Sequence, residues 1–92
     1  MPYLPESFRW EIEETTDLKH TARYFASLKD EDFAGAINYQ NHVICKKFIE
    51  KKGIKYWRLA LVVGTLLLTI LELVRRVVTP YEDEAIKRNG DV

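Results

Sequence analysis

The pattern of hydrophobic and polar residues is dominated by one apolar stretch in the second half of the chain. The 13 residues of the run 59–71 include no charged side chain, and charge returns with Glu72. This run alone is too short to cross a membrane, because a hydrocarbon core of about 30 Å needs roughly 20 helical residues. Runs of this length are also typical of buried helices in soluble proteins, so the uncharged run by itself does not decide between the two environments.

Helical geometry makes the apolar surface longer than the uncharged run. At 100° per residue, one side of a helix is continuously apolar as far as residue 78, and the opposite side carries a narrow polar stripe. The apolar face consists of Ala60, Val63, Leu67, Ile70, Leu71, Val74 and Val78. The polar stripe consists of Arg58, Thr65, Thr69, Glu72 and Arg76. We therefore predict a transmembrane helix within residues 54–80, whose polar stripe faces other transmembrane helices because charged side chains are costly in lipid.

The flanks of the apolar stretch also favour a membrane helix. Tyr56 and Trp57 precede it, and aromatic residues of this kind anchor helices at membrane interfaces. Pro80 predicts the end of the helix, and residues 81–92 have the composition of a polar tail. More Lys and Arg residues lie before the span than after it, which predicts an N-terminus on the cytoplasmic or matrix side.

Glu72 allows two interpretations. Arg75 and Arg76 follow it by three and four residues, a spacing that places oppositely charged side chains side by side on a helix. We expect a salt bridge, within the helix or to a partner helix. The alternative is a carboxylate that takes part in proton or ion transfer within a larger complex. The nearby arginines favour the structural role.

Residues 17–53 carry the signals of two helices. Thr16 and Asp17 resemble a helix start and predict a short helix over about 17–28. A second helix is predicted over about 30–52, and Gly53 lies where a left-handed cap would end it.

The predicted second helix is rich in lysine toward its end. Its basic cluster consists of Lys46, Lys47, Lys51, Lys52 and Lys55. Basic amphipathic helices next to a membrane span commonly lie at the membrane surface, so we expect this region to bind anionic lipid headgroups. The alternative is a solvated charged face on a helix that packs against a partner protein.

The first 16 residues are predicted to form an extended N-terminal arm. Two early prolines favour an extended start, and Phe8, Trp10 and Ile12 alternate with charged residues. No second strand pattern is present to pair with this segment. Because exposed aromatic residues need a partner to cover them, we expect the arm to lie on the surface of a neighbouring protein.

Overall charge and the scarcity of reactive residues restrict the possible chemistry. The chain has 14 basic and 14 acidic residues, and this zero net charge gives no indication of nucleic-acid binding. Cys45 is the only cysteine, so no disulfide within the chain is possible. His20 and His42 are far apart and lack further ligands at metal-binding spacing. We expect no catalytic site, no metal and no cofactor.

The sequence thus predicts an all-α chain with an arm, two helices and a single transmembrane helix. The preferred function is a non-catalytic single-pass subunit that stabilises a larger membrane complex. The run Leu-Leu-Leu-Thr-Ile-Leu-Glu at residues 66–72 resembles the first transmembrane helix of voltage-sensor-type cation channels, two-pore channels among them. That resemblance implies the N-terminal segment of a channel, although no gating-charge helix or pore loop follows. A soluble helical adaptor is the third possibility.

Overall fold

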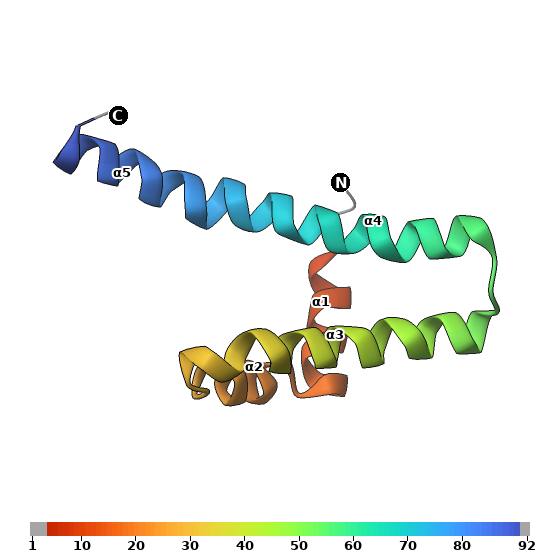
Figure 1. The fold of residues 1–92 in the computed structure, drawn as a ribbon. Helices are drawn as coiled ribbons and strands as arrows, with labels where there is room; N and C mark the ends of the chain where they lie inside the picture. Colours follow the sequence, from red (N-terminus) through yellow and green to blue (C-terminus); the bar gives the residue numbers. More distant parts are fainter. Residues whose placement is uncertain (1–3, 91–92) are drawn as a thin grey trace. The chain divides into compact units, whose positions relative to one another are not determined.

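The computed structural model describes residues 4–90, and its regular secondary structure is entirely helical (Figure 1). The all-α prediction is therefore confirmed. The chain divides into two units, Met1–Lys51 and Lys52–Val92. The helices are α1 (Glu6–Thr16), α2 (Leu18–Ala26), α3 (Asp30–Lys52), α4 (Tyr56–Leu73), the π-helical turn η1 (Val74–Val78) and α5 (Thr79–Asn89).

The prediction of an extended N-terminal arm is wrong from Glu6 onward, because residues 6–16 form the helix α1. Pro5 lies at its N-cap, where a missing N–H removes no helical hydrogen bond, and its carbonyl accepts from the Phe8 and Arg9 amides at 3.1 Å. Phe8 and Ile12 are four residues apart and share one face of the helix. The first three residues of the predicted arm lie outside the described part.

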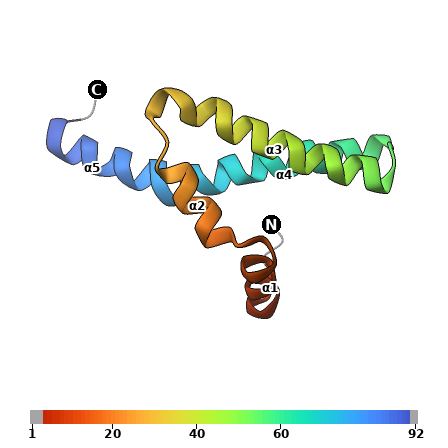
Figure 2. The ribbon, with the colours of Figure 1, turned by 90° about the horizontal axis from the view of Figure 1, so that it is seen from below.

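Asp17 separates α1 from α2, and the two helices contact each other (Figure 2). Its backbone is left-handed, at φ 50° and ψ 49°, and its N–H donates to the Glu13 carbonyl. Asp17 therefore terminates α1, and its side chain makes no capping bond to α2. The short helix predicted over 17–28 is present as Leu18–Ala26.

The predicted helix over about 30–52 matches α3, and Gly53 has the expected positive φ, at 97°. The lysines near the end of α3 point in several directions around its axis. At 100° per residue, the lysines at 46, 47, 51 and 52 point in directions of about 0°, 100°, 140° and 240° around the axis. They form a collar around the end of the helix instead of a stripe along it.

In the second unit, a continuous helix of 34 residues runs from Tyr56 to Asn89 (Figure 1). It is about 51 Å long at the rise of an α-helix. The predicted end of the helix at Pro80 is therefore wrong, because the polar segment after it is helical as far as Asn89. The turn η1 ends at Val78, two residues before Pro80, and the Thr79 amide donates to the Val74 carbonyl, five residues back. This wider turn accommodates the proline ring, which would clash within a regular α-helix.

No side chain among residues 4–90 is buried, although many large apolar side chains are present. A soluble domain gains most of its stability from apolar surface that it removes from water. The described chain therefore has no hydrophobic core of its own.

We expect Gly53→Ala to loosen the link between α3 and α4, because a side chain at φ 97° is strained by roughly 1–2 kcal/mol. The measurement is amide hydrogen exchange over residues 50–58 of the full chain in detergent micelles, which should become faster. Gly64→Ala is the matched control. Gly64 is helical and a Cβ there would meet nothing within 4 Å, so this change should not affect exchange at the link. Unchanged exchange in Gly53→Ala would contradict the role of the glycine.

Candidate membrane helix and its polar residues

The helix Tyr56–Asn89 is long and apolar enough to cross a membrane, and its most apolar window is entirely unburied. Among the described residues it is the one helix with this property. The predicted apolar face consists of exposed side chains: Val63 is 60% exposed, Leu67 55% and Leu71 60%. These observations support membrane integration by length and composition.

Arg58 connects the start of this helix to the end of the preceding one. Its Nη1 donates to the carbonyls of Lys52 at 2.7 Å and Gly53 at 2.6 Å, and its guanidinium lies 4.5 Å from the centre of the Trp57 ring. The side chain thus satisfies carbonyls that lack helical amide partners and is directed back along the chain, away from the apolar run. This cap was not predicted, because it depends on the turn at Gly53.

The hydroxyl groups of Thr65 and Thr69 bond within their own helix. Thr65 Oγ1 donates to the Leu61 carbonyl at 2.8 Å, and Thr69 Oγ1 donates to the Thr65 carbonyl at 3.3 Å. Such bonds to the carbonyl four residues earlier satisfy a hydroxyl without any partner helix. The two threonines can therefore face lipid or protein without leaving a donor unpaired. Their contribution to the stripe is the small size of their side chains.

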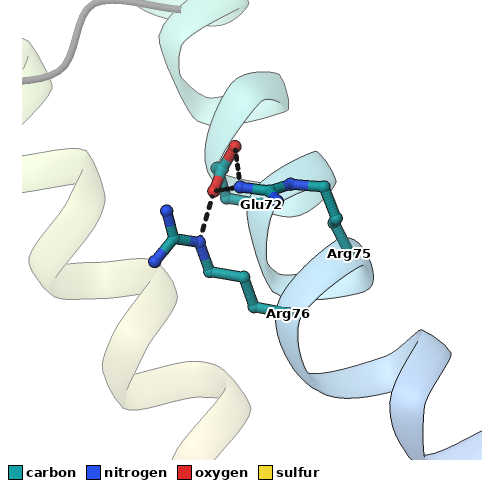
Figure 3. Close-up of polar contacts among 3 residues, drawn as sticks. All are labelled: Glu72, Arg75 and Arg76. Atoms are coloured by element: carbon teal, nitrogen blue, oxygen red, sulfur yellow. Dashed lines mark hydrogen bonds and ion pairs between the residues drawn. The ribbon is translucent and has the colours of Figure 1, made fainter.

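Glu72 forms the centre of a charged cluster with Arg75 and Arg76 (Figure 3). Arg75 Nη2 donates to Glu72 Oε2 at 3.0 Å, with a second contact to Oε1 at 3.4 Å. Arg76 Nε donates to Oε2 at 2.7 Å. The spacing of three and four residues thus produces the predicted intrahelical salt bridges. Both arginines turn back toward the N-terminal end of the helix, as helical side chains do.

The residues of the predicted polar stripe therefore take part in three separate local arrangements. Arg58 caps the preceding helix, the threonines bond their own backbone, and Glu72 binds Arg76 together with Arg75. Arg75 was predicted as a possible ion-pair partner of Glu72 but not as a member of the stripe.

The predicted anchor and basic cluster are both accessible. Tyr56 is 88% exposed and Trp57 60%. All five lysines of the cluster, Lys46, Lys47, Lys51, Lys52 and Lys55, are exposed, and within residues 4–90 none forms an ion pair.

Cys45 is a half-buried free thiol, and no three His, Cys, Asp or Glu side chains among residues 4–90 are grouped to hold a metal ion. A shallow groove on α3 includes His42 and Glu50, but all its lining residues belong to that one helix. It is a space between neighbouring side chains and does not enclose a ligand.

A family model described as a domain of unknown function, DUF6899, matches residues 1–92. No curated protein and no solved structure matches the chain.

Proposed function

The chain belongs to the DUF6899 family, and we propose that it is a non-catalytic single-pass membrane subunit that packs into a larger membrane complex and stabilises it. The observation that carries the proposal is an apolar helix of membrane-spanning length in a described chain without any buried side chain. Lipid would cover the apolar face, and other subunits would cover the amphipathic helices. The N-terminus would lie on the cytoplasmic or matrix side.

The spacing of the two ends of the span supports this proposal. Arg75 follows Trp57 by 18 residues, and Arg76 follows Tyr56 by 20. The aromatic pair and the arginine pair are thus separated by about 27–30 Å of helix. This length equals the hydrocarbon thickness of a typical bilayer, about 30 Å. If the aromatic pair lies at one interface, the two arginines lie at the other. Glu72 is then one turn below that surface, where its ion pairs reduce the cost of burial.

Extraction and purification of the full tagged chain test the two parts of the proposal. We expect the protein to stay in the membrane pellet after alkaline carbonate washing and to elute from mild detergent together with other membrane proteins in fixed ratio. Release into the supernatant would mean that the helix is not in lipid, as a soluble adaptor requires. Retention in the pellet followed by elution as a single species would contradict a role as a subunit.

A further inference from the structure

The lysine collar provides a binding surface next to the proposed span. We propose that the collar, Lys46, Lys47, Lys51, Lys52 and Lys55, binds the phosphate groups of anionic phospholipids in the leaflet that holds Tyr56 and Trp57. This inference rests on the proposed membrane insertion of the helix that begins at Tyr56.

The collar has a strong positive charge that the described chain does not neutralise. Residues 43–58 contain six basic side chains and only one acidic side chain, Glu50. Within the described residues no ion pair joins Glu50 or any lysine of the collar to another group. The guanidinium of Arg58 already donates hydrogen bonds to two backbone carbonyls, so Arg58 is not counted in the collar. The five ammonium groups are thus available to an external anion.

The arrangement of the lysines indicates what kind of anion fits. The four lysines on α3 point around the axis of the helix end, and Lys55 follows it in the link, so a flat acidic protein surface or a nucleic-acid groove would meet only some of them. A headgroup layer surrounds an immersed helix on every side. A collar can therefore bind lipid phosphates with all of its members, whereas a stripe would be needed for a one-sided partner.

The collar also lies close enough to the membrane surface. Lys55 is the residue before Tyr56, and Arg58 fixes the link by bonding back to Lys52 and Gly53. Lys46 is six residues before Lys52 on the same helix, or about 9 Å along it. This separation is fixed by the helix and does not depend on the direction in which α3 leaves the link. The Debye length is about 8 Å at physiological salt, and lysine side chains extend their charge further.

The two ends of the span differ in charge, which predicts selectivity for one leaflet. The α5 helix at the other end carries Glu82, Asp83 and Glu84 against Lys87 and Arg88, and Lys87 pairs with Glu84 at 3.4 Å. Excess positive charge is thus concentrated at the Tyr56 end, as is common for segments that face an anionic leaflet.

The test uses the full chain in phosphatidylcholine bilayers that contain spin-labelled phosphatidylserine or spin-labelled phosphatidylcholine as the probe. We expect the fraction of motionally restricted lipid to show about threefold or greater preference for phosphatidylserine, and high salt to reduce it. The variant with all five collar lysines changed to Gln should lose this preference. The control variant K19Q/K29Q/K87Q removes three lysines elsewhere and should keep it.

Equal association of the two lipids with the wild-type chain would overturn the inference and would instead favour an acidic protein partner for the collar. An undiminished preference in the five-lysine variant would overturn it as well. Carbonate resistance of the same proteoliposomes is measured in parallel. A chain that is washed off contradicts the proposed function itself, whereas a chain that stays inserted without lipid preference contradicts only the lysine collar as a lipid site.

Discussion

Glu72→Gln is expected to reduce membrane insertion of the chain strongly. The substitution keeps the size of the side chain but removes the negative charge that binds Arg75 at 3.0 Å and Arg76 at 2.7 Å. Two guanidinium groups would then enter the edge of the bilayer without the carboxylate that binds them. We expect insertion to become less favourable by about 1–3 kcal/mol, since a charge at the membrane centre costs roughly 2.5–3.5 kcal/mol and less toward the surface.

Insertion can be measured from glycosylation of acceptor sites introduced on either side of the span in the full chain. The triple variant E72Q/R75Q/R76Q is the matched control, because it removes the arginines together with their partner. It should insert at least as well as the wild type. Together with the variant R75Q/R76Q, the single and triple variants and the wild type form a thermodynamic cycle that separates the ion pairs from the bare cost of the charges. Insertion of Glu72→Gln at the wild-type level would show that the cluster lies outside the hydrocarbon region.

The sequence was most informative where a local rule determines structure. The boundaries of α3 could be predicted from the acidic residues in its first turn and the glycine after its end. The salt bridges of Glu72 could be predicted from the spacing of oppositely charged residues on a helix. The helix α1 was missed because the apolar residues Phe8, Trp10 and Ile12 occur at every second position. That spacing fits a strand, yet it also places Phe8 and Ile12 on one helix face, so five residues cannot distinguish the two periods.

Other features depend on geometry that periodicity does not contain. Pro80 normally ends a helix, and only the π-helical turn η1 allows the helix to continue to Asn89. Each π-type bond spans one residue more than an α-type bond, so side chains after Val78 are displaced around the axis relative to an ideal wheel. The 100° spacing used to place the two predicted faces therefore applies from Tyr56 to Leu73, where the helix is regular, and not within η1 or beyond it.

If the chain is a subunit as proposed, the pair of substitutions Thr65→Phe and Thr69→Phe is expected to separate it from the other subunits without affecting insertion. Both threonines lie on the side opposite the apolar face, and each hydroxyl bonds a carbonyl of its own helix. Replacing them removes the donors together with the bonds, so no polar group is left unsatisfied in the helix. Phenylalanine is also more favourable in lipid than threonine, and membrane retention should be unchanged.

The effect on assembly should be large because closely packed membrane helices depend on small residues at their interface. Two bulky side chains would cost on the order of 2–4 kcal/mol in packing, or at least tenfold in affinity. The measurement is the amount of partner protein that elutes with the tagged chain in mild detergent. Val63→Phe with Leu67→Phe adds similar bulk on the opposite, apolar face and should retain the partners. Because both pairs lie in the regular part of α4, equal loss from the two faces would mean that the polar stripe is not the side that meets protein.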